Sequence, residues 1–148
     1  MKTKVEIVYK PDRSTKRQQP IFEVKVPAGF PSPAGDYEED KLDLNKHLIK
    51  NPAATFFVRV TGHSMVKAGI HDGDLLVVDR SIEPRDKNVV IAVVNGELTV
   101  KRIRIRKNKR LSLKLSLEAE NENYQSQEIN EEMEFEVWGV VTNVIHAL

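Results

Sequence analysis

Cysteine is absent from this chain of 148 residues. Disulfide bonds, thiolate metal sites and cysteine nucleophiles are therefore excluded. A large excess of charge of either sign is also absent, because 23 Lys and Arg residues stand against 22 Asp and Glu residues. Bulk electrostatics thus give no indication of a nucleic-acid or membrane binder, and any basic surface must be local.

Long apolar runs are missing as well. No stretch approaches the roughly 20 apolar residues of a membrane-spanning helix, and the charged segment 1–10 lacks the apolar run of a signal peptide. We therefore expect a cytoplasmic protein. Hydrophobic residues still make up 40% of the chain, which is enough for a folded core.

The first 41 residues differ in character from the rest. A short strand is predicted at 5–8, and the polar segment 11–20, with a proline at each end, predicts a mobile loop. Apolar and charged residues alternate from Phe22 to Val26, which favours a second short strand. The prolines and glycines of 27–35 then exclude regular structure, so we expect an extended N-terminal arm that is too short for a helix-turn-helix domain.

After the arm, the pattern indicates an antiparallel β domain with one or two short helices. One helix is predicted at 43–50, and a single helical turn at 63–68. Asn95-Gly96 is a strong hairpin signal between two strand patterns. The predicted strands of this domain are 55–60, 74–79, 89–94, 97–105, 111–117 and 135–147, the last being a strand pair or one long bent strand.

Lys101 is the first candidate for chemistry. Alternation along its strand places Lys101 on an apolar face with Ile103 and Ile105, and places Val100 on the other face with the arginines of 102–106. Burial lowers the pKa of a lysine, and a neutral amine can act as a general base. The alternative is a lysine at a sheet edge whose amine extends into solvent.

Ser64 is the candidate nucleophile. It follows a strand and Gly62, at a turn before the predicted helical turn. Nucleophilic serines favour such turns, where the backbone N–H groups of Ser64 and Met65 can bind an oxyanion. The alternative is an ordinary serine that caps the helical turn.

The remaining polar motifs favour structural roles. His63 is badly placed to deprotonate its neighbour, and no histidine pair has metal-ligand spacing, so we expect no metal and no cofactor. Asp72-Gly73-Asp74 is interpreted as a tight turn before a strand. The basic run 101–110 lacks interleaved aromatic residues and is interpreted as the solvated face of a hairpin.

Five segments together resemble the UmuD-like branch of the LexA family of self-cleaving proteins. In sequence order they are 29–34 (GFPSPA), 42–45 (LDLN), 62–65 (GHSM), 69–79 (GIHDGDLLVVD) and 99–101 (TVK). The resemblance covers nearly all of 24–148. It implies a LexA/UmuD-like protease domain at 42–148, preceded by an arm, 1–41, that contains the cleavage site.

The resemblance also implies roles for individual residues. Ser64 matches the nucleophile, Lys101 the general base, and Ala28–Gly29 the bond that is cut. UmuD has a cysteine before that glycine, whereas Ala28 here matches the Ala-Gly bond of LexA. The implied protein is a homodimer that cleaves itself when stimulated by RecA filaments on single-stranded DNA. Its product, 29–148, would join a UmuC-like Y-family DNA polymerase in error-prone translesion synthesis during the SOS response.

Three other functions are compatible with parts of this pattern. A LexA-like repressor shares the dyad, but a DNA-binding domain does not fit into 28 residues with three prolines, so no sequence-specific DNA binding is expected. A signal peptidase also uses Ser and Lys but needs a membrane anchor. The third is a non-enzymatic polymerase-binding module that retains an inactive dyad.

Overall fold

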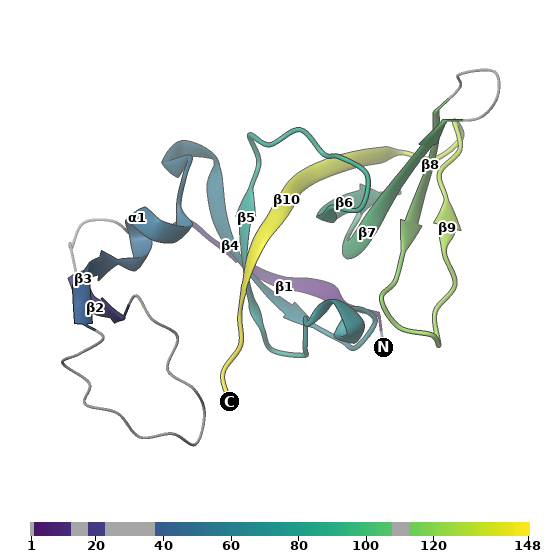
Figure 1. The fold of residues 1–148 in the computed structure, drawn as a ribbon. Helices are drawn as coiled ribbons and strands as arrows, with labels where there is room; N and C mark the ends of the chain where they lie inside the picture. Colours follow the sequence, from purple (N-terminus) through teal and green to yellow (C-terminus); the bar gives the residue numbers. More distant parts are fainter. Residues whose placement is uncertain (1, 13–17, 23–37, 108–112) are drawn as a thin grey trace. The chain divides into compact units, whose positions relative to one another are not determined.

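The computed structural model describes residues 2–12, 18–22, 38–107 and 113–148 (Figure 1). The chain divides into two compact units, of which one contains Met1–Pro11 and Asn51–Leu148 and the other Asp12–Lys50. The N-terminal strand thus belongs to the larger unit. That unit is an antiparallel β structure, which confirms the predicted mainly β class.

The larger unit is an eight-stranded sheet in which every neighbouring pair is antiparallel. In spatial order the strands are β1 (Lys4–Tyr9), β4 (Thr55–Thr61), β5 (Leu75–Asp79), β10 (Phe135–Ile145), β6 (Val89–Val94), β7 (Glu97–Lys107), β8 (Leu113–Glu118) and β9 (Gln127–Glu128). Strand β1 also pairs with β7, where Lys4 lies opposite Thr99. The six strands from β1 to β7 therefore close into a ring.

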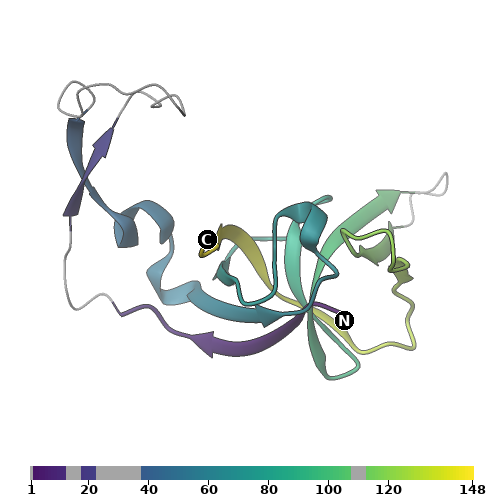
Figure 2. The ribbon, with the colours of Figure 1, turned by 90° about the horizontal axis from the view of Figure 1, so that it is seen from below.

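Strand β10 joins the two sides of this ring (Figures 1 and 2). Its first half pairs with β6 and its second half with β5, and Val140 pairs with both. The pairing shifts between Val137 and Gly139 and again between Val141 and Asn143. Such irregularities bend a strand, so the long bent strand expected at this position is found.

The hairpin of β6 and β7 has the turn that its sequence predicts. Asn95 and Gly96 both have positive φ, at 49° and 84°, as a two-residue type I′ turn requires. The pairing runs from Val94 opposite Glu97 to Val89 opposite Arg102. This register places Lys101 beside Val90, in the middle of the sheet.

Two apolar clusters cover the two faces of strand β6. Ile91 belongs to the first cluster, while Val90 and Ala92 belong to the second. Val100 is fully buried in the first cluster. The expectation that Val100 shares a solvated face with the arginines is wrong, because the closed sheet covers both faces of β7 at this point.

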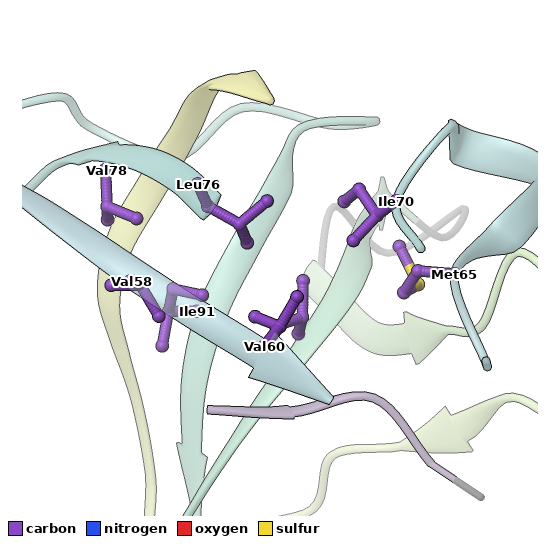
Figure 3. Packing of buried hydrophobic residues seen from close by; sticks show 8 residues of the cluster. Val58, Val60, Met65, Ile70, Leu76, Val78 and Ile91 are labelled. Atoms are coloured by element: carbon purple, nitrogen blue, oxygen red, sulfur yellow. The ribbon is translucent and has the colours of Figure 1, made fainter. Parts of the chain in front are cut away.

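The first cluster extends from the sheet to the loop after β4 (Figure 3). Val58 and Val78 lie at one end of the cluster, and Met65 and Ile70 lie together at the other. Met65 immediately precedes the 3-10 helix η3 (Val66–Ala68), which ends at Gly69. A second 3-10 helix, η2 (Pro52–Ala54), precedes β4.

The smaller unit contains a β-hairpin and one short helix. Strands β2 (Gln18–Phe22) and β3 (Glu38–Asp43) are antiparallel, and α1 (Leu44–Leu48) follows directly. The side chain of Asp43 caps α1 by accepting a hydrogen bond from the Asn45 N–H. The helix is shorter than the predicted 43–50, because the chain is already extended at Ile49.

The structure tests the loop that was predicted in the arm but not the predicted cleavage site. The predicted loop at 11–20 is wrong for its last three residues, which belong to β2. The predicted cleavage site, Ala28–Gly29, lies outside the described residues, in the sequence that connects β2 to β3. Within the residues that are described, no helix is long and apolar enough to cross a membrane.

Candidate functional site

Ser64 lies on a turn that is fixed from several sides. Gly62 has a φ of 101°, and its N–H donates a 2.8 Å hydrogen bond to Asp72 Oδ1. A Cβ atom added to Gly62 would lie 2.2 Å from the carbonyl oxygen of Lys2, so both the backbone angle and the space require glycine. Met65 anchors the other side of the turn in the apolar cluster.

The interpretation of Ser64 as an ordinary helix cap is wrong. The residue at the N-cap position of η3 is Met65, and no side chain caps this helix. Ser64 is instead fully buried, and its Oγ accepts a 2.7 Å hydrogen bond from the Thr3 N–H. Within the described part of the chain, the N–H groups of Ser64 and Met65 donate no hydrogen bond, which leaves both free to bind an oxyanion.

Lys101 is buried in the sheet with only 8% of its surface exposed, so it does not reach solvent from a sheet edge. Its amine lies 5.7 Å from the centre of the Tyr124 ring, and none of the described carboxylates forms an ion pair with it. Burial lowers the pKa of the Lys101 amine below its ordinary value, and the nearby charge of Lys2 lowers it further.

The segment Lys2–Lys4 contacts both Ser64 and the strand that contains Lys101. Thr3 contacts Ser64 through its N–H, and its carbonyl oxygen accepts a 3.4 Å hydrogen bond from Thr99 Oγ1, two residues before Lys101. Although both residues are described, no hydrogen bond joins Ser64 directly to Lys101. The catalytic roles of Ser64 and Lys101 therefore stay predictions.

An open pocket of about 610 Å³ lies beside Lys101. The β6–β7 turn lines it from one side, and Lys2, Lys4 and Gln127 contribute further lining residues. The buried amine thus borders a space that is accessible to another chain segment.

The three arginines that follow Lys101 on β7 are paired with acids. Arg102 contacts Glu120, and Arg104 lies 3.2 Å from Asp86 and 3.5 Å from Glu118. The Ile105 N–H, together with the Arg104 guanidinium, lowers the pKa of the Asp86 carboxyl. These contacts agree with the interpretation of this run as a hairpin face, although 108–112 lie outside the described residues.

The other polar motifs have structural partners. Asp74 is buried, accepts the His71 N–H and lies 2.5 Å from His146 Nδ1. His63 is exposed, and its carbonyl oxygen accepts a hydrogen bond from the Asn121 amide. In the described ranges, no group of three or more histidines and acids has an arrangement suited to a metal ion.

Sequence reasoning missed three residues of this site. Asp72 was recognised as part of a turn, but its contact with Gly62, ten positions earlier, depends on how the chain folds back after η3. Tyr124 lies in a polar segment without periodicity. Thr3 carries no signal at all, because its contact with Ser64 spans 61 positions and uses only the backbone N–H.

Comparison with known proteins assigns this region to one family. The model of the Peptidase S24-like family matches residues 20–142, which include Ser64 and Lys101. Protein SamA of Salmonella typhimurium is 55% identical over 86 residues, covering 58% of this chain and 61% of SamA.

Two further relatives match over most of their length. Protein ImpA of Escherichia coli is 45% identical over 128 residues, covering 86% of this chain and 83% of ImpA. Protein MucA of Escherichia coli is 39% identical over 140 residues, covering 95% of this chain and 92% of MucA. These matches extend the similarity from the protease region into the arm.

Proposed function

The chain belongs to the S24-like peptidase family as a UmuD-like SOS mutagenesis protein, and from this premise we propose that it is a self-cleaving serine peptidase that cuts its own Ala28–Gly29 bond. The observation that carries the proposal is the environment of Lys101. A lysine that is 8% exposed and lacks an acidic partner among the described residues is costly as a cation. Its neutral amine is a suitable general base.

The proposed reaction begins with a proton transfer from the Ser64 hydroxyl to the neutral Lys101 amine. The Ser64 oxygen attacks the Ala28 carbonyl carbon, and the resulting oxyanion accepts hydrogen bonds from the N–H groups of Ser64 and Met65. The Lys101 ammonium then gives its proton to the Gly29 nitrogen as the peptide C–N bond breaks. Gly29 leaves as a new N-terminus.

A water molecule completes the reaction. The Lys101 amine takes a proton from water while the water oxygen attacks the acyl carbon on Ser64. The ester bond breaks, Ser64 regains its proton from Lys101, and Ala28 leaves as a carboxylic acid that loses its proton to solvent. Before these steps the arm binds as an added strand, since small side chains at positions 28 and 29 let its backbone approach the nucleophile.

The proposal extends to partners through family membership. RecA filaments on single-stranded DNA favour the bound arm and thereby stimulate cleavage. The protein acts as a homodimer, and the product 29–148 associates with a UmuC-like Y-family polymerase for translesion synthesis. Since the arm and the site belong to the same polypeptide sequence, the proposed stimulation of cleavage by RecA filaments needs no second protease.

Mass spectrometry of the purified full chain tests the cleavage reaction. We expect a fragment that begins at Gly29 after incubation with RecA, single-stranded DNA and nucleotide, or near pH 10, where a lysine with a lowered pKa is largely neutral. Ser64→Ala and Lys101→Ala should stay intact under the same conditions. An intact mass that persists for days in both conditions would refute the proposal and leave a polymerase-binding module.

A further inference from the structure

The segment Lys2–Lys4 lies where a substrate has to reach the candidate nucleophile. Thr3 is fully buried, and its N–H lies 2.7 Å from Ser64 Oγ. Ser64 itself is fully buried. A peptide carbonyl therefore cannot approach the Ser64 hydroxyl while Thr3 stays in this position.

The same segment extends between two strands of the sheet. Lys4 lies opposite Thr61 at the end of β4 and opposite Thr99 on β7. The Thr3 carbonyl oxygen accepts a hydrogen bond from Thr99 Oγ1. Backbone pairing with a neighbouring strand is how an extended peptide binds by strand addition, and this mode accepts many sequences because the backbone makes the hydrogen bonds.

Gly62 contacts the backbone of the segment Lys2–Lys4 so closely that no side chain fits between them. The Cβ atom that any other residue would have at position 62 meets the Lys2 carbonyl oxygen at 2.2 Å and its carbon at 2.5 Å. The chain that occupies this place passes directly over the turn before Ser64. Glycine at position 62 thus admits a backbone strand next to the nucleophile.

The bound segment is not itself a substrate. Ser64 Oγ contacts an amide N–H of the segment, whereas attack requires a carbonyl carbon. The N–H also engages one of the two lone pairs of the Ser64 hydroxyl oxygen. Lys2–Lys4 therefore occupies the site without being positioned for cleavage.

Strand β1 is held weakly for an element that covers a catalytic site. Ile7, Val8 and Tyr9 are 40% or more exposed, and Val5 is the residue of β1 that packs against the apolar cluster. The pairing of β1 with β4 also shifts between Val5 and Ile7. An element with little apolar burial opens at low cost, so this segment can leave while the rest of the sheet stays folded.

We propose that Lys2–Lys4 occupies the peptide-binding strand position of the peptidase and that the cleavage segment of the arm binds there only after Lys2–Lys4 has left. This inference rests on the proposed function, since it concerns the regulation of the same site. It identifies the ligand of the position as an extended peptide strand. Self-cleavage is then limited by the fraction of molecules in which the position is vacant.

A reversible cross-link tests the inference in the full chain. Lys4 and Thr61 are opposite one another in an antiparallel pair, and the chain has no cysteine of its own, so Lys4→Cys with Thr61→Cys provides a single defined disulfide. We expect the oxidised protein to cleave at least about tenfold more slowly with RecA filaments than the same sample after reduction. The two single-cysteine variants, treated identically, are the matched controls.

Removal of the segment should have the opposite effect. A variant that lacks residues 2–4 retains Val5 and the rest of β1, and we expect it to cleave several-fold faster than the wild type, with circular dichroism and thermal unfolding as the folding controls. Faster cleavage after deletion and slower cleavage after oxidation support the inference. Equal rates for the oxidised and reduced protein overturn it but leave the proposed function intact, because cleavage still occurs.

A binding measurement keeps the inference testable even if no form cleaves. A fluorescent peptide with the sequence of residues 24–33 is titrated against Ser64→Ala proteins that carry the disulfide or the deletion. We expect the deletion variant and the reduced protein to bind this peptide at least about tenfold more tightly than the oxidised protein. Equal affinities would show that Lys2–Lys4 does not compete with a peptide.

Discussion

The two halves of strand β7 hold basic side chains in opposite environments. Lys101 in the first half is buried and has no acidic partner among the described residues. Arg102 and Arg104 in the second half are half-buried, and each lies against a carboxylate. The two environments adjoin, because Lys101 and Arg102 are consecutive residues of this strand.

The difference reflects two uses of a basic residue. Arginines that remain charged attach the edge of the hairpin to neighbouring loops, at Glu120 and at Asp86. An acid beside Lys101 would stabilise the ammonium and abolish its use as a base. The absence of a carboxylate around Lys101 in the described structure is thus as important to the proposed chemistry as the lysine itself.

The largest expected effect comes from replacing Lys101 with a residue that cannot act as a general base. Lys101→Arg retains the charge, and Lys101→Met retains much of the volume, but neither provides a neutral base. We expect both to reduce self-cleavage by about 10²-fold or more, the range of a general base. The measurement is the initial rate of fragment formation at neutral pH with RecA filaments.

Stability separates the two variants from one another. Lys101→Arg buries a permanent charge and should unfold at lower urea concentration than Lys101→Met, which buries none. An arginine variant as stable as the methionine variant would mean that position 101 is solvated in solution, contrary to its 8% exposure.

An intermediate effect is expected when Lys101 receives an acidic neighbour of the kind that the arginines have. Tyr124 lies with its ring 5.7 Å from the Lys101 amine. Tyr124→Glu introduces a carboxylate there and should raise the pKa of Lys101. At a fixed pH below this pKa, the neutral fraction of Lys101, and with it the rate of self-cleavage, falls about tenfold for each unit by which the pKa rises. Tyr124→Gln is the matched control, because it makes the same change of shape without the charge.

The pH profile identifies the cause of that decrease. If the added charge acts through Lys101, cleavage by Tyr124→Glu recovers at higher pH, while Tyr124→Gln keeps the wild-type profile. A uniform decrease at every pH in both variants would instead indicate a loss of packing at position 124.

The smallest expected effect is on stability as a function of pH. The pKa of Lys101 is lower in the folded state than in the unfolded state, so the unfolded chain binds more protons between the two pKa values. The free energy of unfolding therefore rises with pH through that window and levels off above the unfolded value of 10.5. The gain is about 1.4 kcal/mol for each unit of pKa difference.

Urea unfolding at several pH values measures this gain. Ser64→Ala prevents cleavage during the experiment, and Ser64→Ala with Lys101→Met is the reference that lacks the titrating amine. We expect the reference to be more stable near neutral pH and its advantage to shrink as the pH rises. A constant difference across the range would contradict a lowered pKa at Lys101.

Features that depend on local sequence were predictable. The Asn95-Gly96 turn and the strands on both sides of it are found where periodicity places them. Alternation placed Lys101 on the same side as Ile103, but the choice between a buried lysine and one at a sheet edge needed the pairing of β7 with β6 and β8. In contrast, the catalytic roles of Ser64 and Lys101, and the cleavage site, stay predictions.

Features that depend on closure of the sheet were not predictable. Val100 was expected to face water, and only the pairing of distant strands reveals that both faces of β7 are covered. The two-residue strand β9 is too short to have a pattern of its own. The position of Thr3 depends on the pairing of Lys4 with Thr61 and Thr99, which are far from it in the sequence, and no local signal encodes this pairing.

Strand β10 has a consequence for the order in which the protein is made. It lies between β5 and β6, so the gap between these two strands cannot close until the last strand has left the ribosome. Lys101 on β7 and the turn after β4 lie on opposite sides of that gap, and before β10 is made only β1 joins the two sides. During synthesis the arm therefore leaves the ribosome well before the sheet around the candidate site is complete, so the proposed self-cleavage has to wait until β10 has been made.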